Sequence, residues 1–316
     1  MRHRELVVGA IAALTLVAAC SSGGTSTTSS GAHSSTGAAE ASRPSPGCSA
    51  NGKATVRSGN ATIEVAGARR SYLLQVPRST RPHHPAPLIL QFHGYASDGP
   101  RFDQLTQLGA RGTAQGSYVA SPTGSNQTWQ FAPHGTDARF VDALVDRVER
   151  SACIDLNRVS ATGFSAGAAF TLFYACARQD SIDAIATIAV EFQLGCKQPM
   201  PILAFHGTKD PAVPYVNGAI GASLPGTRVR GTELNMSDWA RLNACKPAPA
   251  TTRIGAEVTR ETWSRCTKNA DTVLYRIEGG GHAWPGAPPN GAGLTTEQVS
   301  ATNKILAFFR NHALGR

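Results

Sequence analysis

The hydrophobic pattern of the chain changes repeatedly between short apolar runs and longer amphipathic segments. Residues 61–77 predict two strands joined by a glycine-containing turn, and residues 87–94 form a continuous apolar run that ends in His-Gly. A run of that length is typical of a central strand covered on both faces. Further strands are predicted at residues 117–122, 158–163, 201–207 and 272–277.

Helical periodicity fills several of the intervals between these strands. Residues 136–152 place apolar side chains along one face, and residues 101–116 and 295–312 are also predicted to be helical. Thr295 and Gln298 have the spacing of a capping box at the start of the last helix. Strands that alternate with helices predict an α/β fold, with a mostly parallel central sheet and helices on both faces.

The first residues have the pattern of an export signal. Arg2 and Arg4 precede an apolar run over residues 6–19, which is too short for a membrane-spanning helix. The run ends in LVAAC, which resembles the lipobox of bacterial lipoproteins. Residues 1–19 are therefore predicted to be a signal peptide and Cys20 to be the lipidated residue that anchors the chain to a membrane. An ordinary signal peptide with a chance cysteine is the alternative, so the exported chain is expected in the cell envelope or outside the cell.

Residues 20–47 consist mainly of Ser, Thr, Gly, Ala and Pro. Such a segment buries too little apolar surface to offset its ordering entropy, so it is predicted to be a flexible linker. Residues 48–316 then form one large α/β domain with no internal repeat.

Six cysteines remain when Cys20 is set aside. An even number in an exported chain predicts three disulfides, and six cysteines allow 15 pairings, so the connectivity stays open. Short-range pairing favours two bridges and leaves a third: Cys176–Cys196, Cys245–Cys266 and Cys48–Cys153.

The formal net charge is +9 at pH 7, and the basic residues are scattered. No Lys or Arg run alternates with aromatic residues, so nucleic-acid binding is not expected. No Cys-x-x-Cys or His-x-x-x-His spacing indicates a metal site, and no cofactor is predicted.

The pentapeptide GFSAG holds Ser165 between a predicted strand and a small, apolar segment predicted to be a helix. At such a sharp turn, glycines at 163 and 167 let the serine project alone above the sheet, and the following helix aims backbone N–H groups at the same point. Ser165 is therefore predicted to be a catalytic nucleophile. The alternative is a packing turn with a spectator serine.

A serine nucleophile needs a base, and the base needs an orienting acid. The loops at the carboxyl ends of parallel strands gather along one edge of a sheet, so the partners should follow strands. Asp210 follows the strand at 201–207, and His282 follows the strand at 272–277 and three glycines. The order Ser165, Asp210, His282 is the order expected of α/β-hydrolases.

Other acids and histidines fit these two roles less well. Asp180 and Asp183 lie in a predicted helix-end loop, and Asp271 precedes its strand instead of following it. His312 lies in the last predicted helix, where a solvated histidine is expected. Two further histidines at strand ends are predicted to shape the site without acting as the base: His93 and His206.

An oxyanion hole usually combines two backbone donors. The N–H of Ala166, directly after the predicted nucleophile, is the first candidate. The second is the N–H of Tyr95, in the loop HGYASDG that follows the strand at 87–94. Loss of one such donor typically raises the barrier by about 3–4 kcal/mol.

The motifs LQFHGYASDG, GFSAG, AFHGTKDPAVPY and GGGHAWPG together resemble the secreted esterases of the polyhydroxybutyrate depolymerase and feruloyl esterase type. The resemblance runs from about residue 60 to residue 310 and implies an α/β-hydrolase catalytic domain over residues 48–316, with Ser165, Asp210 and His282 as its triad. With its export signal, the chain is also similar to a mycobacterial-style group of esterase lipoproteins. Relatives often carry Asn where this chain has Ala166, and many have paired cysteines in the segment 123–135, so the substrate class stays open.

Two tryptophans are predicted to line the substrate pocket, Trp284 because it lies close to His282 and Trp129 by its aromatic face. The predicted function is a serine carboxylesterase that cleaves small or polymeric esters through an acyl-enzyme intermediate. A non-catalytic surface lipoprotein that binds polysaccharide or protein on a hydrolase scaffold is the alternative. Peptidase activity is a weaker option.

Overall fold

The computed structural model describes residues 41–49, 55–79, 83–193, 195–220, 228–289 and 293–313. The predicted signal peptide, Cys20 and most of the predicted linker lie outside these residues. Within them, no helix is both long enough and apolar enough to cross a membrane.

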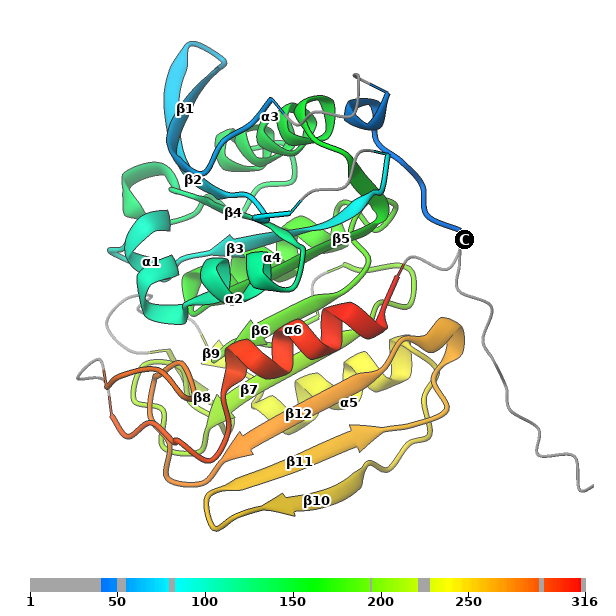
Figure 1. Ribbon diagram of the computed structural model, residues 1–316. Coiled ribbons are helices and arrows are strands. Elements are labelled where there is room, and N and C mark those ends of the chain that lie inside the picture. Colours follow the sequence, from blue (N-terminus) through cyan, green and yellow to red (C-terminus); the bar gives the residue numbers. More distant parts are fainter. Residues whose placement is uncertain are drawn as a thin grey trace, which may run out of the picture. The chain divides into compact units, whose positions relative to one another are not determined.

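In the described part of the chain, ten strands form one large sheet (Figure 1). From one edge to the other their order is β1 (Gly59–Val65), β2 (Ala68–Gln75), β4 (Tyr118–Pro122), β3 (Ala86–Phe92), β5 (Ile154–Phe164), β6 (Ile185–Ile188), β7 (Ile202–Gly207), β12 (Thr272–Ile277), β11 (Val258–Trp263) and β10 (Ala250–Ile254). The strands from β4 to β12 pair in parallel, whereas β1 and β2 at one edge and β10 and β11 at the other are antiparallel. A short hairpin of β8 (Gly218–Ala219) and β9 (Arg228–Val229) lies apart from this sheet.

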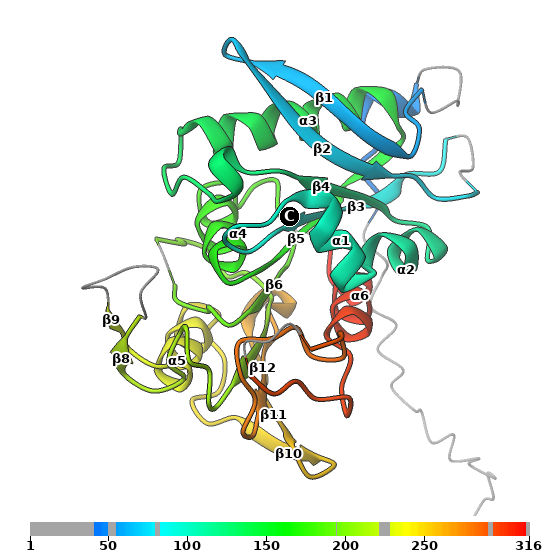
Figure 2. The ribbon, with the colours of Figure 1, turned by 90° about the vertical axis from the view of Figure 1, so that its left-hand side faces the viewer.

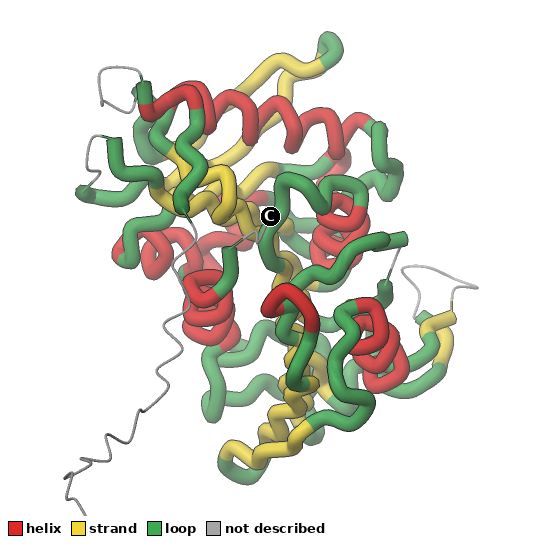
Figure 3. Tube along the Cα trace, turned by 90° about the vertical axis from the view of Figure 1, so that its right-hand side faces the viewer, coloured by secondary structure: helices red, strands yellow, loops and turns green. Residues whose placement is uncertain are grey.

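Helices cover both faces of the sheet (Figures 2 and 3). One face carries α1 (Gly99–Thr106), α2 (Leu108–Ala114) and α6 (Ala301–Asn311), and the other carries α3 (Thr136–Ser151), α4 (Ala166–Cys176) and α5 (Thr232–Leu242). Three short 3-10 turns complete the described elements: η1 (Pro46–Cys48), η2 (Ser125–Gln127) and η3 (Thr267–Asn269). The α/β-hydrolase fold predicted from the sequence is confirmed.

The apolar runs of the sequence become the buried centre of this layered structure. All six residues of β7 are buried, as are the last five of β3, because helices cover both faces of these strands. One hydrophobic cluster packs α3, α4 and α5 against the sheet, and a second packs α1, α2 and α6 against its other face.

The segment predicted as one helix at residues 101–116 is broken in two. Gln107 separates α1 from α2 with a left-handed backbone at φ 55°. Asp103 explains the break, because its Oδ1 accepts hydrogen bonds from the Gly109 N–H at 2.8 Å and from the Gln91 side chain at 2.6 Å. A side chain that competes for backbone donors in this way disrupts helix continuity.

The last helix also differs from the prediction. It begins at Ala301 instead of residue 295, and Ser300 caps it by accepting a hydrogen bond from the Asn303 N–H. The predicted capping box is wrong, because the Gln298 side chain accepts a hydrogen bond from the Glu257 N–H of another segment.

Three disulfides form, and they pair as short-range pairing favoured. They join Cys48–Cys153, Cys176–Cys196 and Cys245–Cys266. The first ties the start of the domain to the residue directly before β5, and Ser45 adds hydrogen bonds to Ala152 and Ile154 there. Residues 43–47, placed in the linker by the sequence analysis, therefore pack on the domain.

The carboxyl ends of the parallel strands share one edge of the sheet. β3 leads into Tyr95, β5 into Ser165, β7 into Asp210 and β12 into His282. The topology thus brings these four predicted residues to the same edge of one sheet.

Candidate active site

Ser165 occupies a strained turn between β5 and α4. Its backbone has φ 55° and ψ −119°, which few residues other than glycine adopt. A Cβ atom at position 163 would lie 2.3 Å from the Gly167 carbonyl oxygen, and a Cβ at position 167 would lie 2.0 Å from the Phe92 carbonyl oxygen. Both glycines are therefore required for this sharp turn to form.

The turn aims the start of α4 toward the end of β3. Ala166 is the first residue of α4, and the first N–H groups of a helix have no partner within the helix. Ser165 is fixed from both sides, because its N–H donates to the Ile188 carbonyl at 3.0 Å and its carbonyl accepts from the Ala169 N–H at 3.0 Å. A partial positive charge thus lies beside the serine side chain.

Asp210 and His282 form a direct contact. The Asp210 Oδ2 lies 2.7 Å from the His282 Nδ1, and the Asp210 Oδ1 accepts hydrogen bonds from the N–H groups of Ala212 and Val213, each at 2.8 Å. Burial opposes ionisation, but the hydrogen bond and charge of His282, together with the Val213 N–H, hold the pKa of Asp210 below its ordinary value. The carboxylate is therefore suited to orient and stabilise a charged imidazole.

The His282 ring also lies next to the serine turn. Its centroid is 4.7 Å from the Phe164 ring, the residue directly before Ser165, with the two planes tilted by 37°. Only 9% of His282 is exposed. His282, the predicted base, follows β12, and this contact places it beside the turn after β5 that carries Ser165, the predicted nucleophile.

The tautomer of His93 fixes the peptide that precedes Tyr95. The His93 Nε2 accepts a hydrogen bond from the Gly124 N–H at 2.9 Å, so the proton of the neutral ring is on Nδ1. Nδ1 then donates to the Gly94 carbonyl at 2.7 Å. Burial lowers the pKa of His93, which is consistent with a neutral ring. Because a trans peptide directs its C=O and N–H oppositely, the Tyr95 N–H points away from His93.

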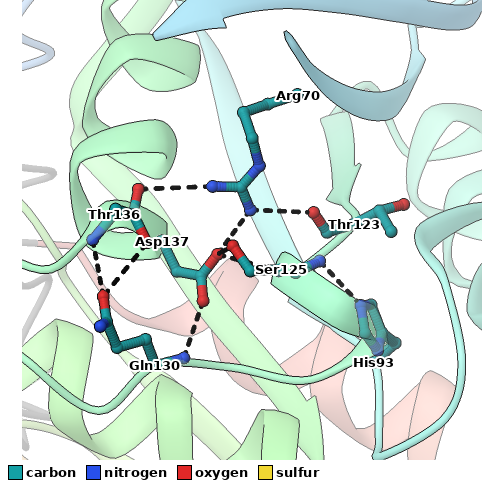
Figure 4. A network of polar contacts seen from close by, with 8 residues as sticks. Arg70, His93, Thr123, Ser125, Gln130, Thr136 and Asp137 are labelled. Atoms are coloured by element: carbon teal, nitrogen blue, oxygen red, sulfur yellow. Dashed lines mark hydrogen bonds and ion pairs between the residues drawn. The ribbon is translucent and has the colours of Figure 1, made fainter. Parts of the chain in front are cut away.

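A buried ion pair supports the loop that holds His93 (Figure 4). Arg70 and Asp137 are 8% and 0% exposed, and their side chains lie 2.5 Å apart. Asp137 also accepts hydrogen bonds from the Ser125 N–H and hydroxyl and from the Gln130 N–H. The segment from residue 123 to residue 130 is thereby fixed where its Gly124 N–H meets His93.

Both tryptophans predicted to line the pocket are inside the core. Trp129 is 3% exposed, stacks on Phe170 and donates its ring N–H to the His93 carbonyl. Trp284 is 2% exposed and donates its ring N–H to the Thr302 hydroxyl at 3.0 Å. This differs from the predicted role, since neither indole offers an open face to a ring-shaped substrate.

The rival acids and histidines lie elsewhere or behind the site. His312 was expected to be solvated, but it is 3% exposed, with Nδ1 bonded to the Phe308 carbonyl and Nε2 3.3 Å from Asp271. Asp183 is buried at the opposite end of β6, where it accepts a hydrogen bond from Ser160. His206 does lie beside the site, in contact with Asp210.

Sequence reasoning missed Glu191, whose carboxyl group contacts His206 behind Asp210. The signal was an acidic residue directly after the apolar run 185–190, which begins with β6, a strand that the periodicity had not identified. Within the described residues, no group of three or more His, Cys, Asp or Glu side chains is arranged to hold a metal ion.

Comparison with known proteins places this geometry among esterases. No protein-family model matches the chain. Feruloyl esterase B of Piromyces equi is 29% identical over 231 residues, which cover 68% of this chain and 42% of that protein. Feruloyl esterase C of Emericella nidulans is 30% identical over 256 residues, which cover 77% of this chain and 84% of that protein.

A solved structure supports the fold. Acetyl xylan esterase from Aspergillus awamori superposes with a TM-score of 0.55 at 14% identity, over 80% of this chain and 99% of that one. With its fold and these relatives, the chain is a serine carboxylesterase of the α/β-hydrolase type. It belongs to the family of feruloyl esterase C, and a non-catalytic binding protein is not favoured.

Proposed function

We propose that Ser165, Asp210 and His282 are the nucleophile, the orienting acid and the general base of this carboxylesterase. The observation that carries the proposal is the 2.7 Å contact between Asp210 and His282, on a ring that packs against Phe164. A carboxylate bonded to Nδ1 leaves Nε2 as the basic nitrogen, which is the tautomer that accepts a proton from a serine hydroxyl.

The reaction follows from these positions. The Ser165 oxygen attacks the ester carbonyl while His282 takes the hydroxyl proton, and the oxyanion is stabilised by the N–H groups of Ala166 and Tyr95. His282 then gives the proton to the departing alcohol, which leaves an acyl-enzyme. Water, deprotonated by the same ring, releases the acid and restores Ser165.

We infer that the acyl group is aromatic, of the feruloyl type. The support is membership in the family of feruloyl esterase C, whose name states that acyl group. Polyhydroxybutyrate and acetyl xylan are the competing substrates. The competition is tested by comparing kcat/KM for methyl ferulate, acetylated xylan, a polyhydroxybutyrate suspension and a triglyceride, and a preference for any but the first contradicts the feruloyl assignment.

We also propose that Cys20 is lipidated and holds the enzyme on a membrane. The support is the LVAAC pattern after a short apolar run. One test expresses wild type and Cys20→Ser in a bacterial host that processes lipoproteins. Recovery of the variant in the soluble fraction while wild type stays with membranes supports the anchor, and equal distribution contradicts it.

The catalytic roles are tested with Ser165→Ala. We expect kcat for a short-chain nitrophenyl ester to fall on the order of 10³-fold or more, with unchanged folding by circular dichroism. Ser181→Ala, an exposed serine in the loop after α4, is the matched control and keeps wild-type activity. Wild-type hydrolysis by Ser165→Ala, or fluorophosphonate labelling of a residue other than Ser165, overturns the assignment.

A further inference from the structure

A second contact between a histidine and an acid lies directly behind Asp210. His206, near the end of β7, is 2% exposed. Its Nε2 lies 2.9 Å from the Val213 carbonyl oxygen and 3.6 Å from the Asp210 Oδ2, and its Nδ1 lies 2.9 Å from the Glu191 Oε2. One ring thus joins the loop after β6 to the turn that holds Asp210.

The hydrogen-bond partners define where the protons of this ring are. A carbonyl oxygen only accepts, so Nε2 must carry a hydrogen to bond Val213. Nδ1 faces the Glu191 carboxyl and, at 2.9 Å, the Thr232 hydroxyl. With Glu191 ionised, Nδ1 donates as well, and the ring carries a positive charge between two carboxylates.

The surroundings favour this charged arrangement. Glu191 is 3% exposed, and a buried carboxylate is retained at low cost only when a cation and hydrogen bonds compensate it. The titratable groups that face His206 are Glu191, Asp210 and the Tyr215 ring, and His282 lies beyond Asp210. Burial disfavours the charged ring, but the charge and hydrogen bond of Glu191, followed by Asp210, raise the pKa of His206.

The loop that carries Glu191 is itself held in position. The Trp239 ring N–H of α5 donates to the Glu191 carbonyl at 2.8 Å, and Trp239 is fully buried. The backbone from which the Glu191 side chain extends is therefore held in place. This keeps its carboxyl group at a constant distance from His206.

We propose that His206 and Glu191 are positioning residues for ester hydrolysis, in which the protonated ring clamps residues 210–213 and sets a positive charge beside Asp210. The inference rests on the proposed roles of Asp210 and His282. It extends the array by one ion pair, so that Glu191, His206, Asp210 and His282 alternate in charge when His282 is protonated.

The charge has a measurable consequence for the pH dependence of the reaction. A cation beside Asp210 repels a second positive charge on the ring bonded to that carboxylate, so the ion pair of Glu191 and His206 should affect the pH profile of kcat/KM. Because His206 lies nearer Asp210 than Glu191 does, loss of the ion pair should move the acid limb of kcat/KM to higher pH, by less than the loss of one isolated charge would.

The test uses Glu191→Gln in the full chain. A neutral His206 keeps its Nε2 hydrogen on Val213 and accepts from the new amide at Nδ1, so the clamp stays while the charge is lost. For Glu191→Gln we expect the acid limb of kcat/KM for a nitrophenyl ester to move to higher pH. For Glu191→Asp, which keeps a carboxylate, we expect an acid limb closer to that of wild type. Glu233→Gln is the control, because this glutamate on α5 is exposed and binds Tyr215 and Arg276 instead of His206.

Nitrogen NMR of labelled histidine gives a second readout that does not depend on catalysis. Two protonated ring nitrogens on His206 near neutral pH in wild type, and one in Glu191→Gln, support the proposal. A neutral His206 in the wild-type spectrum overturns the proposal, and this result does not require Glu191→Gln to fold. An acid limb that does not shift in a folded Glu191→Gln variant also overturns it. Failure of the triad assignment would look different, because Ser165→Ala would remain active.

Discussion

Asp183 carries a stability cost that depends on pH. Its carboxyl group is 2% exposed, and its Oδ1 accepts hydrogen bonds from the Ser160 hydroxyl and the Ala184 N–H, each at 2.6 Å. Within the described residues, its Oδ2 has no hydrogen-bond partner. Burial raises the pKa of Asp183 from 3.8 to about 7, against the opposing effect of these two hydrogen bonds.

The direction of the effect follows from the two pKa values. Below the ordinary value, the folded and unfolded chains are both protonated, so Asp183 changes nothing. As pH rises from about 4 to about 7, the unfolded chain loses the proton while the folded chain keeps it, so the free energy of unfolding falls. Above about pH 7 the full cost is present, and a shift of about 3 units corresponds to a ceiling of about 4 kcal/mol.

Asp183→Asn removes this cost because the amide has nearly the shape of the protonated acid. We expect the variant to match wild type near pH 4 and to become more stable than wild type by up to about 4 kcal/mol above pH 7. Urea unfolding followed by tryptophan fluorescence, from about pH 4 to about pH 9, measures the difference. Asp180→Asn, an exposed neighbour, should show no such dependence. Parallel curves for wild type and Asp183→Asn would refute the reasoning.

Three further predictions concern the scaffold. Replacing Cys48 and Cys153 with Ala should lower the free energy of unfolding by about 4–5 kcal/mol, because this bridge closes a sequence separation of 105 residues. Removing either short-range bridge should cost about 3 kcal/mol. Equal losses for the three bridges in urea unfolding contradict this prediction. Gly167→Ala should abolish ester hydrolysis or folding, since its Cβ would meet the Phe92 carbonyl oxygen at 2.0 Å, and an active variant excludes that geometry. Trp284→Phe should cost about 1–3 kcal/mol of stability for the lost buried hydrogen bond, with kcat/KM for methyl ferulate within about twofold of wild type. A large increase in KM with kcat unchanged would instead indicate a substrate contact.

The strands that carry the site residues, and the edge of the sheet that they share, could be predicted because local periodicity encodes them. The apolar runs before Ser165, Asp210 and His282 become parallel strands, and parallel strands bring their carboxyl ends together whatever the details of packing. Short-range cysteine pairing succeeded for a similar reason, since a short loop brings its two ends close at low entropic cost.

Side-chain environments could not be predicted because distant residues decide them. The helix break at Gln107 involves the Asp103 side chain, which bonds Gly109 close by and also Gln91 of β3, a partner that periodicity within the segment does not identify. Trp284 lies two residues after His282, and Trp129 was chosen for its aromatic face, but packing against opposite faces of the sheet buries both indoles. The His312 ring likewise contacts a distant residue, Asp271, which precedes it by 41 positions in the chain.

The segment HGTKDPAVP shows how local and distant contacts combine in the site. The Asp210 carboxylate accepts hydrogen bonds from the N–H groups of Ala212 and Val213, so the turn that holds it is determined within four residues. His206, four residues before Asp210, then bonds the Val213 carbonyl and closes the same turn from the other side. The orientation of the acid is therefore encoded locally, before His282 arrives from 72 residues further along the chain. Glu191 is needed for a different purpose, since the turn alone fixes the geometry of Asp210 but only a buried acid keeps the clamping ring charged.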